Sequence, residues 1–171
     1  MIPIRIRMVE DRPPEVAKRR WREIHRAAYL DMGEYWHANF LPRHFEPDAA
    51  REYGYKRRSS AYKKRKRNAA RRNPAKYKKG GDVDLVYTGE LEELLESFVT
   101  VRAFPTRTTV TMRGPRYVTL RPNVSKGSPQ PDKHAELTAV TRGEVRELVA
   151  ILDRGVTRGL NELREPRVTE P

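Results

Sequence analysis

The chain has 171 residues, of which 35% are charged, and its net charge is +13. It contains no cysteine, which excludes disulfide bonds, thiol nucleophiles and cysteine metal sites. No apolar run reaches the length of about 18 residues that a membrane span needs, and the N-terminus lacks the apolar core of a secretion signal. We therefore expect residues 1–171 to form a single domain that is assembled in cytoplasm and contacts no membrane.

The first 41 residues predict a short strand followed by a long helix. Between residues 2 and 8, Ile and Met alternate with Pro and Arg, which is typical of a strand with one buried face. Pro13 and Pro14 suit a first helical turn, and apolar residues recur on one side from about residue 15 to residue 39. Pro42 ends this helix, because the residue before a proline disfavours helical geometry.

Residues 42–81 are predicted to form a basic arm. Positions 51–79 contain 14 Lys or Arg and one acidic residue, so this stretch accounts for the whole net charge of the chain. A short helix is expected over residues 46–54, and a second helix begins after a capping serine at 59 or 60 and ends at Arg72. Cations occur all around the second helix, so we expect it to project from the domain and not to pack on both sides.

This arm is a candidate site for an anionic partner. Its cations would neutralise phosphates, and its interleaved tyrosines would stack on bases or pack against a protein surface. These tyrosines are Tyr53, Tyr55, Tyr62 and Tyr77. A solvated arm without a fixed ligand is the alternative. The residues that we expect to face the partner or DNA are Arg57, Arg58, Tyr62, Lys63, Lys64, Arg65, Lys66, Arg67, Arg71 and Arg72.

An acidic amphipathic helix is predicted after the arm. One of its faces is apolar and carries Leu91, Leu94, Leu95 and Phe98. The other face carries Glu90, Glu92, Glu93 and Glu96. This acidic face is either solvated or contacts the basic arm of a neighbouring copy, and head-to-tail contacts between unlike surfaces close into rings. If the second interpretation is right, high salt dissociates the oligomer.

An antiparallel β-meander is predicted next. Residues 99–104 and 107–112 are rich in β-forming residues and are separated by Pro105 and Thr106, which favour a turn. Residues 116–120 predict a third strand, residues 121–133 a Pro-rich loop, and residues 134–140 a last strand with alternating apolar positions.

The C-terminal part predicts the clearest helix of the chain. Thr141 and Glu144 have the spacing of a capping box, in which each side chain satisfies a free amide at the helix start. The apolar stripe behind it comprises Val145, Leu148, Val149, Leu152, Val156, Leu160 and Leu163. Gly155 and Gly159 weaken the helix but permit close packing. Residues 166–171 are predicted to be a polar tail.

The predicted fold class is α+β. We expect an antiparallel β-meander packed against a long N-terminal helix and an amphipathic C-terminal helix, with an extended basic helical arm. Glu34 and His37 have a metal-binding spacing, but a dimetal site needs a second such pair and the sequence has none. Asp82, Asp84 and Glu90 are interpreted as solvated carboxylates. The nucleophile elbow, the phosphate-binding glycine loop and the dinucleotide fingerprint are missing, so we expect no metal, no cofactor and no catalysis.

Two groups of residues resemble a known family. His44-Phe45, Tyr53-Gly54-Tyr55, Arg58-Ser59 and Tyr62 with the following Lys-Arg run resemble a segment of small virion-assembly proteins of tailed bacteriophages and prophages. The run at residues 85–91 is similar to the hydrophobic-Thr-Gly-x-Leu motif of phage tail-completion and neck proteins, in which a helix and a β-meander follow. The resemblance extends over about residues 40–120. It departs from the family at Glu90, Glu92 and Glu93, where basic residues are common.

The resemblance implies a non-enzymatic structural protein of the virion, at the neck that joins head to tail. It further implies a homo-oligomeric ring of about six copies, which contacts portal or connector proteins, tail proteins and DNA in the channel. In this family motif Thr88, Gly89 and Leu91 would shape the turn that orients the sheet. The alternative is a stand-alone nucleic-acid-binding protein that uses the basic segment at residues 51–79.

Overall fold

The computed structural model of the chain describes residues 14–56, 58–77, 90–97, 99–114 and 132–164. Several predictions lie outside these residues: the strand at 2–8, the third strand at 116–120, nearly all of the loop at 121–133 and the tail at 166–171. The same holds for Arg57, Asp82, Asp84, Thr88, Gly89 and Phe98.

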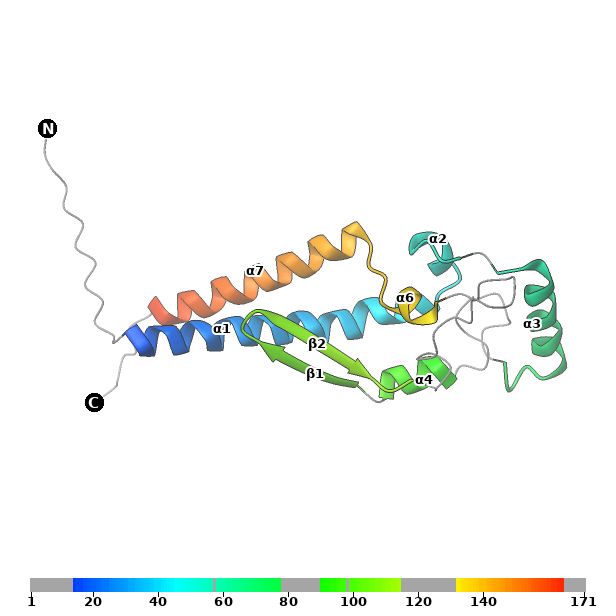
Figure 1. The fold of residues 1–171 in the computed structure, drawn as a ribbon, viewed down its shortest axis with the longest axis horizontal. Coiled ribbons are helices and arrows are strands. Elements are labelled where there is room, and N and C mark those ends of the chain that lie inside the picture. Colours follow the sequence, from blue (N-terminus) through cyan, green and yellow to red (C-terminus); the bar gives the residue numbers. More distant parts are fainter. Residues whose placement is uncertain (1–13, 57, 78–89, 98, 115–131, 165–171) are drawn as a thin grey trace, which may run out of the picture.

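One half of the molecule, which we call the body, consists of two long helices and a β-hairpin (Figure 1). Helix α1 (Pro14–Tyr35) and helix α7 (Arg142–Arg164) run antiparallel side by side. Strands β1 (Val99–Phe104) and β2 (Arg107–Met112) form an antiparallel hairpin that packs on α1. Residues that alternate along both strands are half-buried, because one face of the hairpin covers α1.

Small residues allow the elements of the body to approach closely. A Cβ atom on Gly155 would lie 2.8 Å from the Ala28 Cβ, and one on Gly159 would lie 2.7 Å from the Ile24 Cγ2. This confirms the prediction that the two glycines permit close packing of the C-terminal helix. Gly33 does the same for the hairpin, because a Cβ there would lie 2.5 Å from the Thr108 Oγ1.

The other half, the distal lobe, is built from short elements. After α1 the chain continues as a π-helical turn η1 (Trp36–Phe40) and a 3-10 turn η2 (Leu41–Phe45). The remaining elements of the lobe are α2 (Ala49–Glu52), α3 (Ser60–Arg72), α4 (Glu90–Ser97) and α6 (Lys133–Leu137). Their buried residues form one apolar cluster: Leu41, Phe45, Ala49, Tyr55, Leu91, Leu95 and Leu137.

The structure confirms an α+β class in which helices predominate, but its described sheet has only two strands. The long N-terminal helix, the hairpin at 99–104 and 107–112 and the C-terminal helix are confirmed. The last predicted strand, at 134–140, is wrong, because this segment begins with α6. Asp132 caps that helix by accepting a hydrogen bond from the Ala135 amide at 3.0 Å. The neighbours Glu136 and Leu137 are both buried, whereas a strand would place them on opposite faces.

Candidate anion-binding surface

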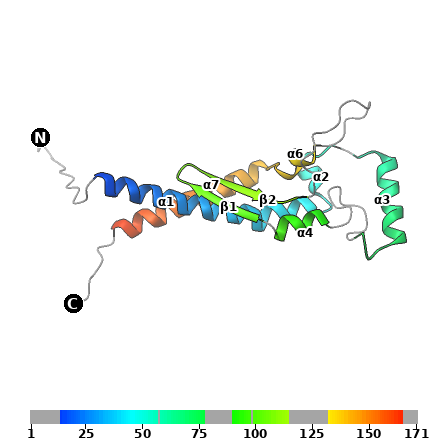
Figure 2. The same cartoon turned by 60° about the horizontal axis from the view of Figure 1, so that its bottom comes forward.

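Helix α3 lies at the end of the molecule farthest from the start of α1 and runs across the direction of the two long helices (Figures 1 and 2). Ser59 begins it as predicted, since its side chain accepts a hydrogen bond from the Tyr62 amide at 3.2 Å. Arg65 lies over the Tyr62 ring, 5.7 Å from its centroid. The helix therefore has a defined start and a defined position at the tip of the distal lobe.

The two faces of α3 differ in charge and burial. The inner face carries Tyr62, Lys66, Ala69 and Ala70, which are buried or half-buried. The outer face carries five exposed cations, Lys64, Arg65, Arg67, Arg71 and Arg72, and α3 contains no acidic residue. Cations were expected all around this helix, but the structure places Lys66 inside, with 2% of its surface exposed, and half-buries Lys63. A long lysine stem packs well along apolar atoms, which makes this inward position possible.

Arg58 does not belong to the exposed surface. Its guanidinium donates two hydrogen bonds to the Glu136 carboxylate, at 2.9 and 2.5 Å, and the two side chains are only 6% and 8% exposed. Such a bidentate pair is strong and fixes the orientation of both groups. Arg58 thus joins the segment before α3 to α6, and its predicted contact with an external anion is replaced by an internal one.

A stack of three rings supports the base of the arm. His44 is fully buried, and its ring stacks on Tyr53 with a centroid distance of 4.0 Å. The His44 Nδ1 is hydrogen-bonded to the Tyr55 hydroxyl, and Tyr55 is itself part of the apolar cluster. The structure therefore corrects the expectation that Tyr53 and Tyr55 stack on bases or on a partner protein. The sequence pattern showed aromatic residues among cations but not their direction.

Glu144 connects this stack to α7. Its carboxylate accepts hydrogen bonds from the Tyr53 hydroxyl at 2.5 Å and from the Thr141 amide at 2.8 Å. The Glu144 amide in turn donates to the Thr141 Oγ1 at 3.1 Å, which confirms the capping box. Arg43 lies 4.0 Å from the same carboxylate. Glu144 therefore belongs both to the N-terminal cap of α7 and to the hydrogen bonds of the aromatic stack.

Burial shifts the pKa values of several groups in and near this cluster toward their neutral forms. It lowers the pKa of His44, against the opposing charge of Glu144, so the imidazole is uncharged near neutral pH. Burial also raises the pKa values of Tyr53 and Tyr55, with the Glu144 hydrogen bond adding to the effect on Tyr53. Burial, and then the positive charge of Arg58, lowers the pKa of Lys133. The stacked and hydrogen-bonded side chains of His44, Tyr53 and Tyr55 stabilise the lobe and form a structural network with Glu144.

The metal spacing at Glu34 and His37 has a structural use instead. The His37 Nε2 is hydrogen-bonded to the Leu95 carbonyl oxygen at 3.0 Å, which ties η1 to α4. The described residues contain no group of three His, Asp or Glu side chains that would hold a metal ion. We therefore identify no residues in this part of the chain that would bind a metal.

The predicted acidic face lies on α4. Leu91 and Leu95 are buried in the apolar cluster, which confirms the prediction that this helix is amphipathic. On the opposite side Glu90, Glu93 and Glu96 are exposed, and Glu92 is half-buried. The distal lobe therefore presents one cationic and one acidic helix surface.

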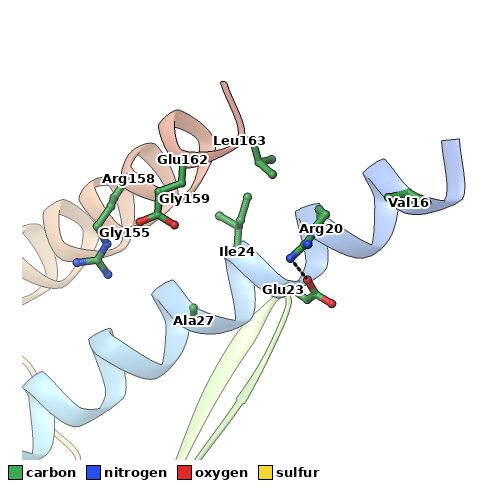
Figure 3. A pocket seen from close by; sticks show the side chains of 10 residues that line it. All are labelled: Val16, Arg20, Glu23, Ile24, Ala27, Gly155, Arg158, Gly159, Glu162 and Leu163. Carbon is green, nitrogen blue, oxygen red and sulfur yellow. Dashed lines mark hydrogen bonds and ion pairs between the residues drawn. The ribbon is translucent and has the colours of Figure 1, made fainter. Parts of the chain in front are cut away.

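A groove of about 610 Å³ lies at the other end of the molecule, between α1 and α7 (Figure 3). Its floor is formed by Ile24, Ala27, Gly155 and Gly159. The charged groups at its edge are largely paired within the chain: Arg20 with Glu23 at 3.3 Å, and Arg158 with Asp31 at 2.8 Å. Among the described lining residues, Glu162 is the remaining charged group, and the others are apolar or small, which suggests packing and not chemistry.

No family model matches the chain, and no curated protein or solved structure is significantly similar to it. None of the described helices combines the length and the apolar character that a membrane span requires.

Proposed function

We propose that this chain is a structural protein of a tailed-bacteriophage virion, that it joins the head to the tail, and that the outer face of α3 contacts an anionic partner there. The observation that carries the proposal is the outer face itself, where five exposed cations lie together without an acidic residue. The resemblance of residues 40–120 to neck and tail-completion proteins supports the location.

The surroundings of α3 favour a fixed docking surface over a loose charged tail. The buried Arg58–Glu136 pair fixes the segment before the helix, the Ser59 cap fixes its start, and Ala70 on its inner face is buried. Like charges at successive turns repel one another, so an anionic partner stabilises the assembled state. The expected partners are an acidic connector surface, the acidic face of α4 in a neighbouring copy, or DNA in the channel.

The same charge separation would support assembly into a ring if unlike surfaces meet head to tail, and the resemblance implies about six copies in that ring. The outer face of α3 and the exposed Glu93 and Glu96 of α4 belong to different elements of one chain. Contacts between them in successive copies would be heterologous and would weaken as salt rises.

Electron microscopy of a lysate that lacks this gene product tests the location. We expect filled heads lying apart from finished tails. Complementation with the triple variant K64Q/R67Q/R71Q should leave heads and tails unjoined. The matched control R22Q/R26Q/R102Q removes three exposed cations from the body and should restore joined particles. Joined particles without the protein would contradict the proposal.

A stand-alone nucleic-acid-binding protein is the second candidate, because the outer face of α3 also suits a phosphate backbone. It requires that the purified chain bind duplex DNA or RNA, with log affinity falling by about 0.9 per neutralised phosphate against log salt on duplex DNA. Fluorescence anisotropy over a salt series distinguishes the two, since the neck function requires assembly on proteins and only weak binding to free DNA.

A further inference from the structure

Helix α7 has an apolar stripe that the rest of the chain covers only in part. Of its described side chains, Glu144 alone is buried. Val145 and Val149 are 44% and 58% exposed, and Leu152, Val156 and Leu160 are half-buried. A helix whose apolar face is 19 residues long, from 145 to 163, normally buries that face against a neighbour.

The geometry of the α1–α7 contact explains the exposure. Helix α1 approaches α7 along Gly155 and Gly159, which face Ala28 and Ile24. At 3.6 residues per turn, Val145 and Val149 point roughly a quarter of a turn away from this line. The stripe is therefore wider than α1, and its outer half forms an open seam along α7, which we define as Val145, Val149, Leu152 and Val156.

The seam is flanked by a pair of opposite charges. Arg146 and Asp153 are seven residues apart, so they lie two turns apart on the same flank of the helix, and both are exposed. Within the described part of the chain neither takes part in an ion pair. A positive and a negative charge on one flank are complementary to the same flank of an identical helix that runs in the opposite direction.

We propose that the seam binds the seam of a second copy of this chain, with the two α7 helices antiparallel and the two-fold axis at the level midway between Arg146 and Asp153. In this arrangement Arg146 of each copy lies opposite Asp153 of the other. Val145 and Val149 meet the partner's apolar residues. Parallel pairing would instead place this flank of the two helices on opposite sides of the interface, so that Arg146 would face neither Asp153 nor Arg146 of the other copy. The contact is isologous, as in most two-fold dimers.

In the dimer, α1 and α7 of one copy pack with α1 and α7 of the other as a four-helix bundle. The seam of each copy is then covered by the other copy. The two bodies run in opposite directions, so the two α3 helices point to opposite ends of the dimer. This inference does not depend on the proposed neck function, since it uses only residues of α7 and concerns the purified protein.

Sedimentation velocity of the full chain over a concentration series tests the dimer. We expect the wild-type protein to sediment with twice the mass of one chain. V149E places a charge in the seam and should raise the dissociation constant by roughly 30-fold or more, the effect of losing a central interface residue. A150E adds the same charge one residue away, on an exposed position off the seam, and should leave the dimer intact.

Charge reversal tests the antiparallel direction. R146E places like charges opposite each other twice and should weaken the dimer about tenfold, and D153R should do the same. The double variant R146E/D153R restores opposite pairs and should recover the wild-type dissociation constant. Circular dichroism identifies any variant that fails to fold. A monomer at all concentrations, a dimer indifferent to V149E, or a double variant no better than the single ones would overturn the proposal.

Discussion

The body and the distal lobe solve the problem of burial in different ways. The lobe is made of short elements, yet it buries Leu41, Phe45 and Tyr55 almost completely and satisfies its internal charges by pairing. The body has the longest and most regular helices. Among its described residues, however, Ala28 is the only buried apolar side chain, and Trp21 is 50% exposed. Regular secondary structure is therefore no measure of how complete a core is.

The two regions differ in burial because they differ in how many elements surround each apolar residue. Two helices and one hairpin form a thin layer, in which each element has a covered and an uncovered side. The lobe instead surrounds its cluster with η2, α2, α4 and α6, so that each apolar residue has neighbours in several directions. We expect substitutions inside the lobe to act on folding, and substitutions on the outer sides of the body to act on association.

The largest effect is expected for the buried ion pair of the lobe. E136A leaves the Arg58 guanidinium buried without its partner and should lower the free energy of unfolding by about 3–5 kcal/mol. Urea denaturation followed by circular dichroism measures it. The control R58M/E136M removes both charges and should lose much less, because a buried apolar pair avoids the cost of an unpaired charge. Equal losses in both would show that the pair contributes through shape alone.

The next effect tests the thin layer of the body. G155A brings a Cβ to 2.8 Å from the Ala28 Cβ and to 3.1 Å from the Ala28 Cα, so the helices must separate, at a cost of about 1–3 kcal/mol. Gly143 is the matched control, since its nearest atom would lie at 3.7 Å. G143A should therefore be neutral or stabilise by up to about 1 kcal/mol through helix propensity. Thermal unfolding of both variants makes the comparison, and an unchanged G155A would contradict the close contact.

A smaller effect is expected at the junction of the two halves. T141A removes the oxygen that accepts from the Glu144 amide and should cost about 1 kcal/mol. T141S keeps the hydroxyl and should remain near wild type. Denaturant unfolding distinguishes these, and a T141A protein as stable as T141S would mean that the cap contributes nothing to α7.

The smallest effect concerns pH and the lobe alone. Burial lowers the pKa of His44 below its ordinary value of 6.5, so the unfolded chain binds the proton more readily than the folded one. Stability should be full above pH 6.5 and should decrease as pH falls below it. In H44Q this part of the pH dependence should be absent, which unfolding curves between pH 7.5 and 5.5 would show. The same slope in H44Q and wild type would assign it to other groups.

The sequence by itself determined the local elements whose signals are strong and short in range. The hairpin at 99–104 and 107–112, the Ser59 cap, the Thr141–Glu144 capping box and the stripe of α7 all depend on residues within a few positions of one another. The sequence also predicted correctly that the basic residues of the arm are concentrated in one helix, which is α3.

Only the tertiary structure decided which of those residues are available to a partner. Arg58 and Lys66 have the same chemistry as Arg67 and Arg71, yet they are internal. Arg58 pairs with Glu136, which is distant in sequence, and Lys66 lies on the inner face of α3 with 2% of its surface exposed. Tyr53 and Tyr55 point inward because His44 and Glu144 lie there. At residues 134–140 the alternation of apolar and polar residues predicted a strand. The segment instead begins with helix α6, in which Glu136 pairs with Arg58, 78 positions away. A sequence pattern depends on neighbouring residues, whereas the burial of a side chain depends on contacts between residues that the fold brings together.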